Sequence, residues 1–268
     1  MTLKALLFDL DNTLVPEMAN YELAFAAACG EAARRHSFDL VQFRTAVFGS
    51  ANQRWQESET FAYCSGLGIG SPTSLLSDFP GDGPEFVTLR EWAPGYRERC
   101  WTDALRPLVK DGLVGELATE LDTAFRAALR SHGRPYDDAL PMLQQVSRSY
   151  ALAVLTNGPH DVQRAKLRAS GLGRFFPTTI ASGEIGFGKP DPRFFLTALE
   201  RLDIRVDEAI AIGDSLERDV VGARNAGLRC IWLNREQRTL PSAVVPDHEI
   251  VSLSEIPALI AVIAPDMS

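Results

Sequence analysis

The sequence has only four cysteines in 268 residues, and no two of them form a Cys-x-x-Cys pair. They are scattered along the chain, at Cys29, Cys64, Cys100 and Cys230. Such spacing indicates neither a zinc knuckle nor a disulfide framework. We therefore expect four reduced thiols in the core.

Basic residues are also in deficit, because 27 lysines and arginines face 35 aspartates and glutamates, giving a net charge of -8. A nucleic-acid or anionic-membrane surface would need clustered positive charge, so neither partner is expected. Long apolar runs are missing too. Ala258 to Ala264 is far shorter than the roughly 20 residues of a membrane span, and the N-terminal apolar run stops at Asp9, too early for a signal peptide. We expect a cytoplasmic protein with a small soluble substrate.

The composition, 46% hydrophobic and 23% charged, is typical of a globular chain with a sizeable core and a second, smaller unit. Its first apolar run, Leu3 to Phe8, predicts a strand buried on both faces of a parallel sheet. Asp9 and Asp11 follow this strand at its carboxyl end, where open α/β sheets collect their ligands. Residues two apart on extended backbone point to the same side, so this pair suits metal binding, nucleophilic attack or proton transfer.

Helical periodicity dominates from Pro16 to about Pro135, which predicts a mostly helical insertion. The segments with this pattern are the stretch after Pro16, Leu40 to Trp55, Tyr96 to Leu108 and Leu113 to Leu129. Residues 64–94 are instead rich in glycine, proline and serine, so this stretch is either functional, mobile or a set of short helices. Three arginines near its end are interpreted as a solvated face: Arg90, Arg97 and Arg99.

Beyond Pro135 strands and helices alternate, which predicts a doubly wound parallel sheet of the α/β class. The expected strands are Ala151 to Leu155, Thr179 to Ala181, Ala209 to Ile212, Cys230 to Leu233 and a short one after Glu249. The expected helices are Asp138 to Tyr150, Asp161 to Ser170, Arg193 to Leu202, Glu217 to Ala226 and a last one near the end of the chain. Residues 1–15 and 136–268 should form this core domain, and residues 16–135 the inserted domain.

Four polar clusters stand just after predicted strands or at a helix start, so one site should gather all of them. They are Asp9 with Asp11, Thr156 with Asn157, Lys189, and Asp214 with Asp219. Several carboxylates with few histidines or cysteines favour a hard cation, and Mg²⁺ suits them best. An anion could bind beside them, because Thr156 offers a hydroxyl, Gly158 leaves backbone N–H groups open and Lys189 adds a positive charge. Phosphate chemistry is therefore indicated.

The same clusters resemble, in order and across the whole chain, the four motifs of the haloacid dehalogenase-like hydrolase superfamily. The matching stretches are Asp9-Leu10-Asp11-Asn12-Thr13, Thr156-Asn157, Lys189 within Gly188-Lys189-Pro190-Asp191-Pro192, and residues 213–219. Asn12 replaces the commoner glycine, a variant that the family tolerates. The insertion resembles the family's helical cap of the first type, although it is longer than most.

This resemblance implies a Rossmann-like core with an inserted cap and a phosphatase that uses magnesium. Asp9 would be the nucleophile and form an aspartyl phosphate, while Asp11 would protonate the leaving oxygen and then activate water. The implied magnesium ligands are Asp9, Asp11 through its backbone carbonyl, Asp214, and Asp219 through water. The implied phosphate-binding groups are Thr156, the amide of Asn157 and Lys189, which also pairs with Asp9.

Other functions remain open at this point. A dehalogenase is disfavoured because carbon–halogen chemistry does not use the acid/base carboxylate that Asp11 supplies. A phosphomutase could pass the phosphoryl group from Asp9 to a sugar instead of water. A phospho-acceptor or catalytically silent binding module is a third alternative. The sequence favours a Mg²⁺-dependent phosphomonoesterase that acts on a small metabolite.

Overall fold

The computed structural model describes residues 2–239 and 244–264. Two compact units make up the chain. Unit 1 comprises Met1–Glu17, Arg134–Asn157 and Ser170–Ser268, and unit 2 comprises Met18–Gly133 and Gly158–Ala169. The helix within residues 158–169, which the sequence analysis places in the core domain, thus groups with unit 2. Residues 1, 240–243 and 265–268 of the predicted core domain lie outside the described residues.

Unit 1 is built on six parallel strands in the order β3-β2-β1-β4-β5-β6. The strands are β1 (Ala5–Phe8), β2 (Ala151–Thr156), β3 (Thr178–Ala181), β4 (Ala209–Gly213), β5 (Arg229–Leu233) and β6 (His248–Ile250). Ala5 pairs with both Ala151 and Ala209, so β1 lies in the middle of the sheet. The predicted doubly wound α/β fold is confirmed.

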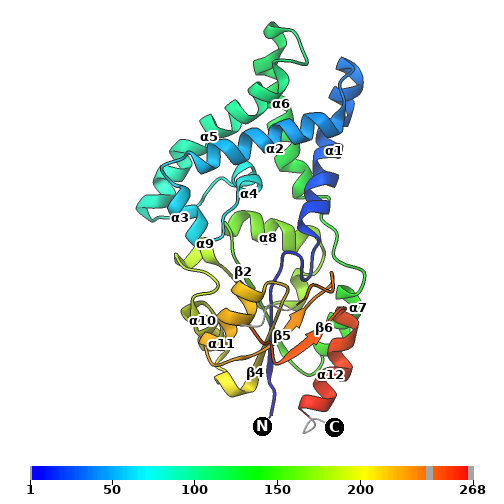
Figure 1. Ribbon diagram of the computed structural model, residues 1–268, viewed down its shortest axis with the longest axis vertical. Helices are drawn as coiled ribbons and strands as arrows, with labels where there is room; N and C mark the ends of the chain where they lie inside the picture. Colours follow the sequence, from blue (N-terminus) through cyan, green and yellow to red (C-terminus); the bar gives the residue numbers. More distant parts are fainter. Residues whose placement is uncertain (1, 240–243, 265–268) are drawn as a thin grey trace. The chain divides into compact units, whose positions relative to one another are not determined.

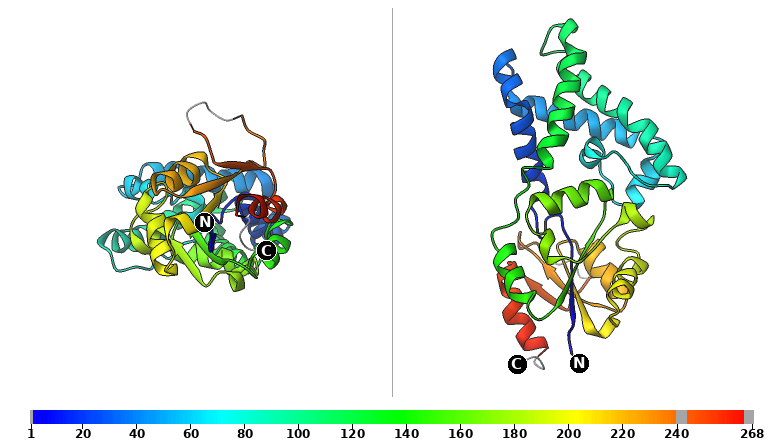
Figure 2. Two further views of the ribbon diagram at one scale, coloured as in Figure 1. Left: turned by 90° about the horizontal axis from the view of Figure 1, so that it is seen from below. Right: turned by 180° about the vertical axis from the view of Figure 1, so that it is seen from behind.

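Helices cover both faces of this sheet, as Figures 1 and 2 show. On one face lie α7 (Ala139–Val146) and α12 (Ile256–Ile263), and on the other α10 (Pro192–Leu202) and α11 (Gly222–Asn225). The short elements are η1 (Gly173–Phe175), α9 (Ser182–Ile185), η2 (Val206–Glu208), the π-helix η3 (Leu216–Val221) and η4 (Leu253–Glu255). Phe194 and Phe195 of α10 join the buried strand residues in one apolar core. The carboxyl ends of the central strands are thereby fixed in place.

Unit 2 is helical. Its helices are α1 (Glu17–His36), α2 (Leu40–Gln56), α3 (Phe61–Gly66), α4 (Ser71–Leu76), α5 (Pro84–Leu105), α6 (Asp111–Leu129) and α8 (His160–Ala169). The helix α5 packs on both α2 and α6. At the centre of its core, Phe25 stacks on Trp101 with 5.7 Å between ring centroids and meets Phe125 edge to face at the same distance. Aromatic pairs at such separations add to the apolar burial that holds the helices together.

The segment rich in glycine and proline includes a short helix, which is one of the alternatives that the sequence leaves open, but residues 67–70 and 77–83 lie outside the helices. It contains the end of α3, all of α4 and the first half of α5. The helix α5 begins at Pro84, well before the predicted start at Tyr96, and runs through Pro94. Leu89, Ala93 and Tyr96 are buried around this proline. Tertiary packing therefore overrides the helix-breaking tendency of Pro94.

The expectation of a solvated arginine face is wrong for Arg97, which is buried with 8% of its surface exposed. Its Nη1 donates to the carbonyl of Ser77 at 2.7 Å, and its Nε lies 3.7 Å from a carboxylate oxygen of Asp122. Burial, with a smaller contribution from Arg126, lowers the pKa of Arg97. This guanidinium therefore acts as an internal brace between α5, α6 and the loop that follows α4.

The helix α8 is attached to unit 2 by specific contacts. Asp161 accepts hydrogen bonds from the Ser77 hydroxyl and the Asp78 backbone N–H, both at 2.8 Å. Val162 enters the core of unit 2, and the ammonium of Lys166 lies 5.0 Å from the centroid of the Tyr21 ring. These contacts explain why α8 groups with the helical unit although it directly follows β2.

All four cysteines are buried free thiols, as predicted. Within residues 2–239 and 244–264, none of the helices combines the length and the apolar character that a membrane crossing demands.

Candidate active site

The first site segment is the turn that follows β1. The Asp9 N–H donates to the Ile212 carbonyl at 2.9 Å, which fixes the end of β1 against β4. The chain then reverses through Asn12, whose φ of 61° lies in the left-handed region that asparagine tolerates. Asp9 is buried with 8% of its surface exposed, whereas Asp11 is half-buried. The turn thus holds two carboxylates in different environments at the centre of the sheet edge.

The second segment joins β4 to η3 and carries two more carboxylates. An Oδ2 atom of Asp219 accepts from the Ser215 N–H at 3.0 Å, so the π-helical turn of η3 aims this side chain back at the strand end. Gly213 makes the approach possible, because a Cβ atom there would lie 2.6 Å from the Asp219 Cβ. The carbonyl of Asp214 is held by the Trp232 indole N–H at 2.9 Å and by Arg238 at 3.0 Å.

Lys189 precedes α10 and brings a positive charge into this group. Its ammonium lies 2.5 Å from Oδ1 of Asp9 and 2.6 Å from Oδ1 of Asp219, and only 3% of the residue's surface is exposed. The side chain of Asn157, at the end of β2, holds the backbone of Lys189 through two hydrogen bonds. Charge-assisted bonds of this kind in a buried site fix both partners in one geometry.

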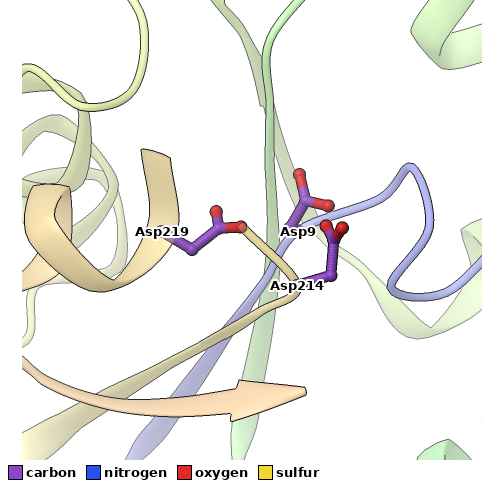
Figure 3. A group of neighbouring side chains, drawn as sticks. All are labelled: Asp9, Asp214 and Asp219. Carbon is purple, nitrogen blue, oxygen red and sulfur yellow. The ribbon is translucent and has the colours of Figure 1, made fainter. Parts of the chain in front are cut away.

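Three carboxylates meet beside this lysine. Each of Asp9, Asp214 and Asp219 offers one oxygen, and these oxygens lie within 4.8 Å of one another. Asp9 comes from the turn after β1, and Asp214 and Asp219 come from the segment that joins β4 to η3; Figure 3 shows the three side chains gathered at one place. Three carboxylates against one ammonium leave two negative charges unbalanced when all are ionised. An oxygen-only, electron-rich donor set fits a hard divalent cation such as Mg²⁺.

The pKa directions agree with this charge imbalance. Burial raises the pKa of Asp9 well above its ordinary value, and the neighbouring Asp219 and Asp214 raise it further while Lys189 opposes them. Burial and then Asp219 raise the pKa of Asp214 to about 6. Burial would lower the pKa of Lys189, but the two carboxylates beside it outweigh burial and raise it. A further positive charge beside these carboxylates would therefore stabilise their ionised forms.

The structure brings together most of the predicted site residues, namely Asp9, Asn157, Lys189, Asp214 and Asp219. Thr156 is buried at the end of β2, and its hydroxyl donates to the Asn157 carbonyl at 3.4 Å. Asp11 is not one of the three clustered carboxylates, and its predicted metal ligand is a backbone carbonyl. The chemical roles of all these residues stay predictions.

Sequence reasoning missed the Asn157 side chain and the Ser215 backbone as supports of the site. Asn157 was assigned only a backbone N–H toward phosphate, and Ser215 had no assigned contact at all. Nothing in the spacing of residues reveals a bond from an amide side chain to backbone 32 positions away. The one available signal is Gly188, since a glycine before a key lysine often marks a close backbone approach.

Comparisons with known proteins agree on one family of hydrolases. Residues 3–227 match the family model described as haloacid dehalogenase-like hydrolase. Phosphoserine phosphatase of Thermus thermophilus is 33% identical over 95% of this chain and 98% of its own length. Glyceraldehyde 3-phosphate phosphatase of Methanopyrus kandleri is 26% identical over 98% of this chain and all of its own length. A 2-haloacid dehalogenase structure from Pseudomonas syringae pv. Tomato DC3000 superposes with a TM-score of 0.63 and 25% identity, covering 98% of this chain and all of the other.

Proposed function

This chain belongs to the haloacid dehalogenase-like hydrolase family, and from that premise we propose that it is a magnesium-dependent phosphomonoester hydrolase. The observation that carries the proposal is the buried contact of Lys189 with Asp9 and Asp219, beside the third carboxylate of Asp214. A nucleophilic carboxylate, a cation for a phosphate dianion and a place for a metal stand together there. The full-length phosphatase relatives support the same chemistry.

In the proposed reaction Asp9 attacks phosphorus in line with the leaving oxygen. A bond forms between its carboxylate oxygen and phosphorus, the ester P–O bond breaks, and Asp11 gives a proton to the departing alkoxide. A water molecule, losing a proton to Asp11, then attacks the aspartyl phosphate and releases inorganic phosphate with free Asp9. Lys189 lies within hydrogen-bonding distance of Asp9 and lowers the cost of bringing a dianion to a carboxylate.

The residues fit a magnesium ion, with Asp9, Asp214 and the backbone carbonyl of Asp11 as proposed ligands and Asp219 ordering its waters. When bound, the ion supplies the positive charge that three carboxylates and a phosphate dianion require.

The substrate that we propose is a small metabolite phosphate. Phosphoserine and glyceraldehyde 3-phosphate, the substrates named for two relatives, are of this class. The Thr156 hydroxyl and the Asn157 backbone N–H, at the end of β2, would bind the phosphate oxygens. Unit 2 would act as a cap that selects the leaving group and excludes water. The four buried free thiols support a reducing, cytoplasmic location.

The decisive experiment measures inorganic phosphate released from a panel of metabolite phosphates, including phosphoserine, with Mg²⁺ or with EDTA. We expect release from some of these esters in Mg²⁺ and loss of at least about 10²-fold in EDTA. The blank is the enzyme with Asp9→Asn. Absence of Asp9-dependent release from every member would favour a binding module, and transfer of phosphate to a second hydroxyl would favour a phosphomutase. A 2-haloacid in the same panel tests the dehalogenase chemistry of the structural neighbour.

The raised pKa of Asp214, about 6 against an ordinary 3.8, predicts how metal binding depends on pH. Without metal, this carboxylate contributes stability when protonated, and the contribution is lost as the pH rises from 3.8 through about 6. Mg²⁺ competes with that proton, so its affinity should fall about tenfold per pH unit below 6. Melting curves with and without Mg²⁺ should show a large upward shift of Tm at pH 7.5 and little shift at pH 5. An equal shift at both would contradict the prediction, and Asp214→Asn, which loses this proposed ligand, should show a much smaller shift at pH 7.5.

A further inference from the structure

The side chain of Asn157 is engaged with protein backbone on both of its polar atoms. Its Oδ1 accepts from the Lys189 N–H at 2.9 Å, and its Nδ2 donates to the Lys189 carbonyl at 2.8 Å. The Asn157 side chain thus binds the Lys189 backbone on both sides of the Lys189 Cα atom. Both bonds have good lengths and connect the end of β2 to a segment 32 positions away.

The neighbouring glycine shows that this grip depends on a close approach. A Cβ atom at position 188 would lie 2.6 Å from the Ser182 Cβ and would collide with Oδ1 of Asn157. Real Cβ atoms do not come this close to other heavy atoms, so only glycine lets the amide reach the Lys189 N–H. The loop before α10 is therefore shaped around the Asn157 side chain.

The consequence lies at the other end of Lys189. Its ammonium contacts Asp9 and Asp219 at 2.5 and 2.6 Å, and a flexible four-carbon stem separates it from the backbone. Burying a lysine side chain costs conformational entropy, because its rotamers are restricted. A fixed backbone reduces the entropy cost that the ammonium contacts must offset. Fixing the Lys189 backbone fixes where that ammonium can reach.

We propose that the Asn157 side chain is a positioning residue, which holds Lys189 so that its ammonium stays between Asp9 and Asp219. This inference rests on the proposed function for its catalytic part. Each polar atom of the side chain binds the Lys189 backbone, which is the contact that its removal would break first. We therefore expect its effect on turnover to pass through Lys189.

Asn157→Ala tests the proposal, with Asn157→Ser as a second variant in case alanine prevents folding. A serine hydroxyl cannot reach both the N–H and the carbonyl of Lys189. We expect kcat for phosphate release, measured with p-nitrophenyl phosphate and Mg²⁺, to fall about 10- to 100-fold while KM changes less than about threefold. In the background of Lys189→Ala, the same change at position 157 should lower kcat no further.

The chain supplies a matched control in Asn234, at the end of β5. Its Oδ1 accepts from the Arg238 N–H at 2.8 Å and its Nδ2 donates to the Arg238 carbonyl at 2.9 Å, the same pattern on a different residue. It is also buried, with 1% exposed. Its Nδ2 also donates to Glu249 at 2.6 Å, so Asn234→Ala should lower Tm at least as much as Asn157→Ala. The loss of kcat should be much smaller, because Arg238 reaches the backbone carbonyl of Asp214 and not the Lys189 ammonium.

Equal losses of kcat in the two alanine variants would overturn the proposal, because the role of Asn157 would then be structural only. A rise in KM without loss of kcat would overturn it too, by assigning the side chain to the substrate. Crystal structures of both variants separate this inference from the proposed function. We expect the Lys189 ammonium to leave Asp9 and Asp219 only in Asn157→Ala, whether or not the protein hydrolyses phosphate esters. An unmoved ammonium would refute the inference, whereas absence of any Asp9-dependent phosphate release from wild type would refute the proposed function.

Discussion

Asp9→Asn should lower phosphate release about 10⁴-fold or more, because an amide oxygen cannot replace the carboxylate as the proposed nucleophile. The substitution is nearly isosteric, and an asparagine oxygen can still accept from the Lys189 ammonium now 2.5 Å away. Burial raises the pKa of Asp9 well above its ordinary value, so its charge costs folding free energy at neutral pH. We therefore expect the metal-free variant to melt no lower than wild type.

Asp138→Asn is the matched comparison. This aspartate is also in unit 1, but its surroundings lower its pKa, whereas those of Asp9 raise it. Burial disfavours its charge, but hydrogen bonds from Arg235 and Ser252 outweigh burial and lower the pKa of Asp138. Arg235 binds it with two bonds of 2.9 Å. Asp138→Asn should therefore lower Tm and leave turnover within about threefold. An active Asp9→Asn enzyme would place the nucleophile elsewhere in the chain.

Lys189→Met should lower kcat by about 10²- to 10³-fold, as expected when one charged group that stabilises the transition state is removed. The change also leaves Asp9 and Asp219 buried without their shared cation, which should cost roughly 3–5 kcal/mol of stability. At about 2–4 °C per kcal/mol, Tm should fall by about 10 °C. Because Asp9, whose pKa is already raised by burial, can take up a proton, the loss should be smaller at low pH, and Mg²⁺ should restore part of it.

Lys166→Met is the control for removing a buried lysine. Lys166 is 4% exposed in unit 2 and faces the Tyr21 ring, with no part in the proposed chemistry. It should lower Tm and leave kcat within a few-fold of wild type. Should both methionine variants lose activity in proportion to their stability, the assignment of Lys189 to the reaction would be withdrawn.

The sequence predicts the central strands well because β1, β2 and β4 are short apolar runs with polar residues after them. Asp9, Thr156 and Asp214 could be assigned to one site for this reason, since parallel strands deliver their ends to the same edge. Lys189 was added to that site from its place at a predicted helix start. The helices of unit 2 are harder to predict from the sequence. The glycines and prolines of residues 64–94 obscure α4 and the start of α5, where long-range packing determines the structure.

Arg97 illustrates what a pattern cannot supply. It stands two positions from the exposed Arg99 in similar polar surroundings, and only the fold places the Ser77 carbonyl within 2.7 Å of one guanidinium and not the other. The same limit applies to the Asn157 grip on Lys189. Every residue except proline offers the same backbone N–H and carbonyl groups. A side-chain contact with the backbone therefore does not depend on the partner's residue type and cannot be predicted from it.

The position of β1 in the sheet also has a consequence for folding kinetics. Asp9 and Lys189 are 180 residues apart, and the pairing of β1 with β2 must close a loop that contains most of unit 2. Contacts of such long sequence separation form slowly, whereas neighbouring helices can associate early. The proposed catalytic group therefore forms only after β1 has paired with β2 and β4, so recovery of activity should report a late stage of refolding that a helical signal does not.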